Sequence, residues 1–485
     1  MTVESRKPSA ALAGGLRPRM HISPHLGNWV LRIAIVLGVL ASATGMGILG
    51  GVLARRNYGF VAFAPAVIPL AILSVELILR RHSVGPLLIL ICAAFLPLKI
   101  PTGSGSPLVG SLLLTMILVG LWLLRMLAVE KRFRLQPSPV NIPLLGFMAT
   151  TVVALFWSNL LVDPLVKWRG FSPVAIGSTV VMIMLPATFL LVANYVNNEK
   201  MLKAMVWVMC LAGVAGAIGQ YARVGWLPIN TGGMFQMWVV ALSVGLALFY
   251  TRLAWWQRLA LLILAGVWVW WGFGLHFSWL AGWLPILVAA GILVFLRSKA
   301  LAVIAVLALA VLFIVQANRY TVALEEENKV SGDTRLAAWK MNWRVTGQHL
   351  LFGTGPAGYA DYYMSYFPDD AMATHSNYID VLAQTGIVGF TFYVLFFIIL
   401  AWRGFRLCQR LKGRGDFPEA LANAAFAGTI GCIVIMGFGD WLLPFAYTQT
   451  IAGFDYAVYN WLFMGTIIVL ERLTKHDDTI PVAHA

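Results

Sequence analysis

Three groups of polar residues that could carry out chemistry follow one another between two long apolar runs. They are Arg335 with its neighbours, the turn Leu-Phe-Gly-Thr-Gly-Pro-Ala-Gly at 351–358, and Thr-His-Ser-Asn-Tyr at 374–378. A guanidinium can bind a phosphate or a carboxylate through two parallel hydrogen bonds. A histidine can accept a proton near neutral pH. A protein that only spans a membrane does not need such a segment, so we expect its function to lie here.

Each group also has a simpler interpretation. An arginine at a membrane surface most often extends its charge towards water, and a histidine at a helix start is most often a hydrogen-bonded neighbour of the cap. Asp333 and Thr334 can cap a helix that places Arg335, Trp339 and Trp343 on one face. The glycines of the turn let the backbone pass close to another group. No strand precedes the turn, so it is not a nucleotide-binding fingerprint.

The elements around these groups are membrane helices. The 485 residues are 60% hydrophobic and 11% charged, and the mean hydropathy is +0.81. Apolar runs of about 18 residues or more recur along the chain, as in membrane-spanning helices. The sequence predicts an all-α, polytopic integral membrane bundle of about 12–14 transmembrane helices, with one long external loop that contains short helices. The predicted segments are 29–54, 60–79, 85–99, 107–128, 142–162, 174–196, 201–221, 232–251, 259–275, 278–296, 300–317, 377–402, 419–439 and 456–471.

The basic residues predict which side of the membrane each connection faces. If alternate connections lie on one side, 23 of the 35 Lys and Arg fall there and 11 on the other, and Arg32 lies inside the first segment. The positive-inside rule then places both termini in the cytoplasm and the loop outside. We therefore interpret the net charge of +15 as a topology signal with affinity for anionic membrane lipids, not for nucleic acid.

This organisation gives a simple domain map. It comprises a disordered cytoplasmic tail at 1–28, transmembrane helices over 29–317, an external loop at 318–376, transmembrane helices over 377–472 and a cytoplasmic tail at 473–485. The four cysteines stand singly, which predicts neither a disulfide framework nor a metal site. On the outer side no Asp, Glu or His has the spacing of metal ligands.

The order of the three groups resembles that of the O-antigen ligase and O-antigen polymerase superfamily. In this family a long periplasmic loop carries an Arg followed by a Trp, then a Leu-Phe-Gly-x-Gly-x-Gly turn and a His-Ser-Asn or His-Asn pair. A helix with a Glu/Gln-x-Gly-Ile-x-Gly pattern follows, and here it is Gln-Thr-Gly-Ile-Val-Gly at 384–389. The resemblance covers about sixty residues.

The resemblance implies a glycosyltransferase of the bacterial inner membrane that needs no metal and no other cofactor. The glycan donor would be linked to undecaprenyl pyrophosphate, and the acceptor would be a hydroxyl of a second glycan, a lipid or a protein. His375 would be the general base and Arg335 a phosphate or glycan contact, with Asn377 beside them. Arginines suit a pyrophosphate leaving group because they neutralise its growing charge.

One departure from the family concerns the donor site. Family members carry a Ser-Arg-Gly stretch before the loop, and here Trp279 stands where the Arg is expected. Arg223, Arg169 and the nearby Lys167, or His276, are the available substitutes on the outer side. The substitution leaves a diverged, inactive member as an alternative.

Two further functions compete with an enzyme. A transporter or flippase would show charges or broken helices at the middle of the membrane, and Glu76 is the only acidic residue deep in an apolar run. A non-catalytic component of a polysaccharide assembly system is the other alternative. The sequence does not separate a ligase from a polymerase.

Overall fold

The computed structural model describes residues 82–475, apart from the short stretches given at the end of this paragraph. All described residues belong to one compact unit, Val75–Ala485. The predicted tails and the segments 29–54 and 60–79 lie wholly or largely outside the described residues. For 312–313, 333–335 and 366 only the backbone is described. The stretches left out are 97, 102–105, 162–165, 168–171, 223–228, 278, 316, 318–320, 323–332 and 367–372.

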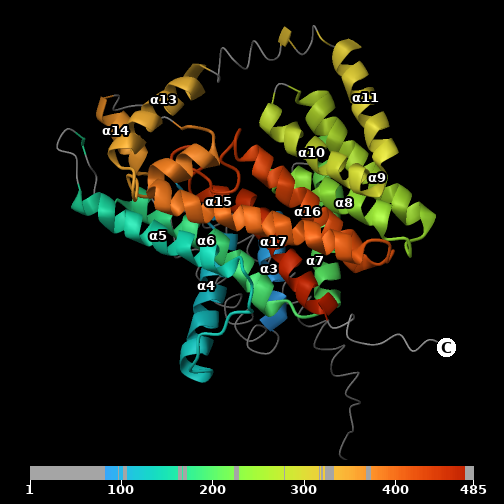
Figure 1. The fold of residues 1–485 in the computed structure, drawn as a ribbon, viewed down its shortest axis with the longest axis horizontal. Helices are drawn as coiled ribbons and strands as arrows, with labels where there is room; N and C mark the ends of the chain where they lie inside the picture. The colour runs from blue at the N-terminus through green and yellow to red at the C-terminus, as the bar shows by residue number, and fades with distance from the viewer. Residues whose placement is uncertain are drawn as a thin grey trace, which may run out of the picture. The chain divides into compact units, whose positions relative to one another are not determined.

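The described chain is a helical bundle, which confirms the predicted fold class (Figure 1). Within it, nine helices are long and apolar enough to cross a membrane, and α3, α8 and α11 are shorter apolar helices. Each predicted segment from 85 onwards coincides with one of these twelve. The membrane helices are α3 (Gly85–Phe95), α4 (Gly110–Leu124), α5 (Asn141–Leu160), α6 (Pro173–Tyr195), α7 (Glu199–Tyr221), α8 (Phe235–Phe249), α9 (Trp255–Val269), α10 (Leu280–Arg297), α11 (Lys299–Val315), α15 (Asn377–Leu411), α16 (Phe417–Ile435) and α17 (Phe454–Lys475).

Short elements lie between the membrane helices. Two π-helical turns, η3 (Arg125–Val129) and η4 (Trp270–Leu275), extend α4 and α9. The strands β1 (Lys99–Ile100) and β2 (Leu108–Val109) pair antiparallel in a small hairpin that the sequence did not predict. The predicted loop contains α13 (Asp333–Gln348) and α14 (Gly358–Tyr366), and short 3-10 turns lie at His82–Val84 (η2) and Ile451–Gly453 (η6).

Helix α17 forms the centre of the bundle. Almost every residue of its apolar part is buried, more than in any other candidate span of the described chain. It packs against α6, α3, α15 and α16. A polar contact also fixes it, because the indole nitrogen of Trp238 in α8 donates to the Asn460 side-chain oxygen at 2.7 Å. The polar group is therefore satisfied inside an otherwise apolar core.

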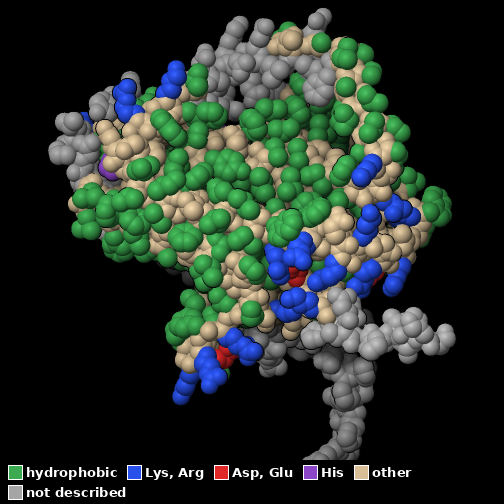
Figure 2. All heavy atoms as spheres, viewed as in Figure 1, with side chains coloured by type: hydrophobic (Ala, Val, Ile, Leu, Met, Phe, Trp, Pro, Cys, Tyr) green, Lys and Arg blue, Asp and Glu red, His purple; other side chains and the backbone are tan. Residues whose placement is uncertain are grey.

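The two ends of the bundle differ in composition. At one end, which we call the motif end, the residues of α13 and α14 pack against the first turns of α15 (Figure 1). At the other, which we call the basic end, Lys and Arg gather at the lower and right-hand margin of Figure 2. There Arg403 of α15 pairs with Glu471 of α17 at 2.8 Å, and Arg472 donates to the carbonyl oxygen of Ala193 in α6 at 2.9 Å. That the basic end faces the cytoplasm stays a prediction from the positive-inside rule.

Candidate active site

The glycine-containing turn at 351–357 is bonded to the backbone of α15. Thr354 donates its amide to the carbonyl oxygen of Ala383 at 2.9 Å and its hydroxyl to the same oxygen at 3.0 Å. The amide of Ala357 donates to the side-chain oxygen of Gln384 at 2.7 Å. The Leu-Phe-Gly turn and the Gln-x-Gly-Ile pattern are therefore two halves of one contact.

A break in α15 makes this contact possible. Gly386 interrupts the helix with a φ of 65°, a conformation that residues with a side chain rarely adopt. A Cβ on Gly386 would collide with the carbonyl oxygen of Leu351, and one on Gly353 would lie 2.6 Å from the carbonyl oxygen of Ala383. The predicted close approach of the backbone is confirmed, and the group approached is the chain's own helix.

The His-Ser-Asn segment is held by the connection between α16 and α17. The Ser376 hydroxyl donates to the carbonyl oxygen of Met436 at 3.1 Å. The Asn377 side chain donates to the carbonyl oxygen of Leu443 at 2.8 Å and accepts from the amide of Leu442 at 3.0 Å. Because both residues are buried, these bonds fix the backbone directly after His375.

A buried polar network supports the same segment from α13 and α14. The Thr374 hydroxyl lies against the Asp380 carboxylate, and the Tyr359 hydroxyl donates to the same carboxylate at 2.6 Å. Burial, and then the nearby Asp380 carboxylate, hold the pKa of Tyr359 well above its usual value, so the phenol keeps the proton that it donates. The indole nitrogen of Trp339 donates to the carbonyl oxygen of Thr374 at 2.8 Å. The helix that carries Arg335 is thereby attached to the segment before His375.

His375 itself is presented at the surface of this network. Its backbone has a φ of 49°, which is uncommon for a residue with a side chain, and its side chain is 41% exposed. The ring nitrogen Nδ1 lies 4.0 Å from Oδ1 of Asp440, whose side chain is 2% exposed. One imidazole nitrogen thus faces a buried carboxylate while the ring remains accessible.

Asp440 is fixed by donors from its own connection. The side-chain amide of Gln449 donates to Oδ1 at 2.9 Å, and the Thr448 hydroxyl donates to Oδ2 at 3.0 Å. The amide of Phe445 also donates to Oδ2, at 3.3 Å. Three donors compensate for the cost of burying the carboxylate, so it is held in one orientation towards His375.

The other predicted site residues have different positions. Asn377 lies at the start of α15 but has a structural role, because its side chain is occupied by the 442–443 backbone. Arg335 lies in α13, and only its backbone is described. Arg169 and Arg223 lie outside the described residues. The convergence of these arginines with His375 stays a prediction.

His276 and Trp279 lie in an aromatic cluster near the connection that carries Asp440. The His276 ring stacks on Trp271 with centroids 3.9 Å apart, and its Nδ1 lies 2.9 Å from the carbonyl oxygen of Trp271. Trp279 contacts the ring of Trp441 edge to face at 5.7 Å. The position where an arginine was expected is therefore occupied by an indole that packs against Trp441, the residue that follows Asp440 in the chain.

The match to a known family covers the loop, His375 and the first part of α15. Residues 208–394, from α7 to the middle of α15, match the family described as O-antigen ligase. This multi-pass membrane protein therefore contains an O-antigen ligase domain over residues 208–394. The family is that of glycan ligases and polymerases, and it implies lipid-linked glycan substrates. No curated protein matches the chain.

Asp440 and its donors lie beyond the matched residues, and we did not predict them. Asp440 follows His375 by 65 positions, so no local spacing connects the two. The available signal was topological, since the connection after α16 falls on the same side of the membrane as the long loop. Among the described residues no group of three or more His, Cys, Asp and Glu could hold a metal ion.

Proposed function

We propose that this O-antigen ligase-family protein transfers a glycan from undecaprenyl pyrophosphate to an acceptor hydroxyl, with His375 as the general base. The observation that carries the proposal is the accessible imidazole of His375 with its Nδ1 facing the buried Asp440 carboxylate at 4.0 Å. A carboxylate in this position favours the tautomer with a proton on Nδ1. The other nitrogen, Nε2, then carries the lone pair that can accept a proton.

The reaction follows from these positions. The acceptor oxygen attacks the anomeric carbon of the donor sugar while its proton passes to Nε2 of His375. The bond between the anomeric carbon and the pyrophosphate oxygen breaks, and undecaprenyl pyrophosphate leaves with the electron pair. Asp440 stabilises the imidazolium that forms, because a buried negative charge lies beside it. Direct displacement of this kind inverts the anomeric configuration.

The leaving pyrophosphate needs positive charge. Arg335 is our first candidate, because its helix is joined to the segment before His375 through Trp339. Arg169 or Arg223 would supply a second guanidinium, since one distant cation neutralises a pyrophosphate poorly. We assign no role in phosphate binding to Asn377, whose buried side chain is bonded to the backbone at 442–443.

The decisive experiment replaces His375 by Gln in the full-length protein. Membranes that contain the protein receive lipid-linked envelope glycan as the donor, and the products are resolved on a gel. Loss of a general base typically costs about 10²–10⁴-fold in rate. The proposal requires such a loss together with wild-type amounts of folded protein, and wild-type rates in the variant contradict it.

A second histidine of the loop serves as the control. His349 lies 2.5 Å from the Tyr362 hydroxyl, and glutamine can keep a hydrogen bond to that hydroxyl. The His349→Gln protein should therefore retain its activity. A chelator should not change the transfer rate of the wild-type or of the His349→Gln protein. The products also distinguish the two reaction types, since a polymerase yields a ladder of longer lipid-linked glycans and a ligase joins the glycan to a different acceptor.

A further inference from the structure

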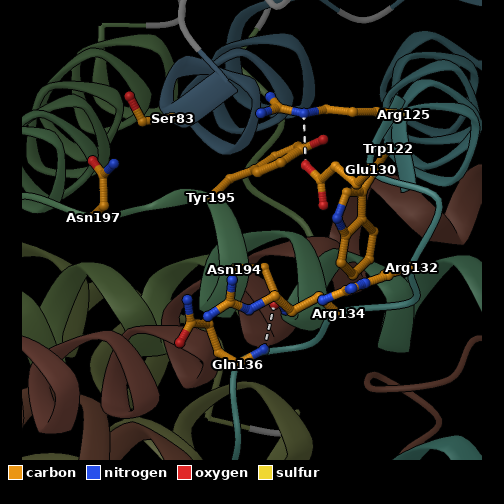
Figure 3. Close-up of a pocket in the computed structure, with 10 residues that line it drawn as sticks. All are labelled: Ser83, Trp122, Arg125, Glu130, Arg132, Arg134, Gln136, Asn194, Tyr195 and Asn197. Carbon is orange, nitrogen blue, oxygen red and sulfur yellow. Dashed lines mark hydrogen bonds and ion pairs between the residues drawn. The ribbon is translucent and has the colours of Figure 1, made fainter. Parts of the chain in front are cut away.

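A second site lies at the basic end of the bundle, far from His375. A cavity of about 730 Å³ opens where α4 and η3 end and α6 ends (Figure 3). Helix α6 begins near the connection that carries Asp440, since Gly177 of its first turns packs against Ile451. Its 23 residues span about 34 Å at 1.5 Å each, so this cavity and His375 are on opposite sides of the membrane. Its lining residues are Ser83, Trp122, Arg125, Glu130, Arg132, Arg134, Gln136, Asn194, Tyr195 and Asn197.

The cavity carries an excess of positive charge. Its three arginines face a single carboxylate, and that carboxylate is already bound, because Arg125 donates to Glu130 at 2.9 Å. In the described part of the chain, the guanidinium groups of Arg132 and Arg134 have no carboxylate within ion-pair distance. Two guanidinium groups are therefore available for an anion. Figure 3 shows that the side chains lining the cavity come from three different segments.

Polar and aromatic side chains complete the lining. The Asn194 side chain is held in place, since its oxygen accepts from the Gln136 amide at 2.7 Å. The rings of Trp122 and Tyr195 meet edge to face with centroids 5.9 Å apart. Trp and Tyr are typical of the region where the hydrocarbon core meets the lipid head groups. The cavity thus has the composition of a head-group site.

Apolar side chains next to the arginines point outwards. Val129, at the end of η3, is 74% exposed, and Leu124 and Leu127 are also exposed. Phe133, which stands between Arg132 and Arg134, is 70% exposed. A site for a soluble anion needs no such surface. A lipid needs both the arginines and the exposed apolar side chains, because its phosphate requires cations and its acyl chains require an apolar path into the bilayer.

We propose that this cavity binds the phosphate head group of an anionic phospholipid in the leaflet opposite the candidate active site. Arg132 and Arg134 bind the phosphate, while Trp122, Tyr195 and the amide side chains surround the head group. The acyl chains run along the exposed apolar side chains of α4 and η3. The site tethers α4 and α6 to the membrane surface at the basic end of the bundle, and it does not depend on the reaction proposed for His375.

The test measures lipid binding to the full-length protein in detergent by native mass spectrometry. Phosphatidylglycerol, phosphatidylcholine and glycerol 3-phosphate are titrated separately. Replacing both arginines, Arg132→Gln with Arg134→Gln, should weaken phosphatidylglycerol binding by at least about tenfold, because hydrogen bonds to charged groups are lost. Both residues are exposed, so the double variant should remain folded.

A matched pair of basic residues provides the control. Arg297 and Lys299 are also exposed, lie at the basic end and line no part of the cavity. The Arg297→Gln, Lys299→Gln protein removes the same charge and should bind phosphatidylglycerol as the wild type does. Equal weakening in both variants would mean a general effect of charge and overturn the proposal. Phosphatidylcholine or glycerol 3-phosphate binding as tightly as phosphatidylglycerol would overturn it as well.

Discussion

Replacing Asp440 with Asn removes the buried negative charge that faces His375 while keeping the shape of the side chain. A nearby carboxylate stabilises the protonated imidazole, so in the wild type it moves the acid limb of the pH–rate profile to higher pH. The Asp440→Asn protein should therefore keep its base deprotonated to a lower pH. Its maximal rate should also fall, because the imidazolium formed during the reaction loses its stabilising partner.

The separation of the two groups sets the size of the shift. At 4.0 Å two unit charges interact by about 1 kcal/mol in water and about 4 kcal/mol at an effective dielectric constant of about 20. The histidine side chain is 41% exposed, so solvent screening favours the lower end of this range. An interaction of about 1–2 kcal/mol moves the acid limb by about 1 pH unit, at 1.36 kcal/mol per unit.

The assay follows glycan transfer from pH 5 to 9 by wild-type, Asp440→Asn and Asp416→Asn proteins. Asp416 belongs to an ion pair with Arg414 at the opposite end of the bundle, so its replacement should leave the profile unchanged. A lower rate in Asp440→Asn with an unmoved acid limb would refute the reasoning. Asp440 would then act only through the donors that it binds in its own connection.

Two further predictions concern the fold and its orientation. Gly386→Ala should lower the melting temperature strongly, because the new methyl group would meet the Leu351 carbonyl and the backbone would be strained; Gly120→Ala, where nothing lies within 4 Å, should not lower it. Lys340→Cys should react with a membrane-impermeant maleimide in intact cells, whereas Lys412→Cys should react only after the membrane is permeabilised. The native cysteines are buried and give little background, and labelling of both variants from outside would contradict the orientation.

The membrane helices could be predicted because the hydrocarbon interior of a membrane restricts the conformations that the backbone can adopt. Backbone groups in the hydrocarbon must bond within their own helix, so each apolar run of sufficient length becomes one. The start of α13 was predicted from the capping residues Asp333 and Thr334, and the structure begins that helix at Asp333. These features are local, and a local pattern was enough to find them.

The remaining features depend on residues that are distant in sequence. The turn at 351–357 predicts a close approach, but only the fold shows that its partner is the break at Gly386. Asn377 was expected at the substrate, yet the backbone at 442–443 occupies its side chain. Asp440 gives no periodic or spacing signal, because its relation to His375 exists only once α15 and α16 have packed together.

The central position of α17 has a consequence for how the protein is made. It is synthesised after the other described membrane helices, yet it fills the space between α3, α6, α15 and α16. Until it arrives, those earlier helices enclose a vacant groove whose walls include Phe189 and Val192 of α6, the residues that Gly465 approaches. The described helices that precede α17 therefore cannot complete their packing until α17 has been synthesised and inserted.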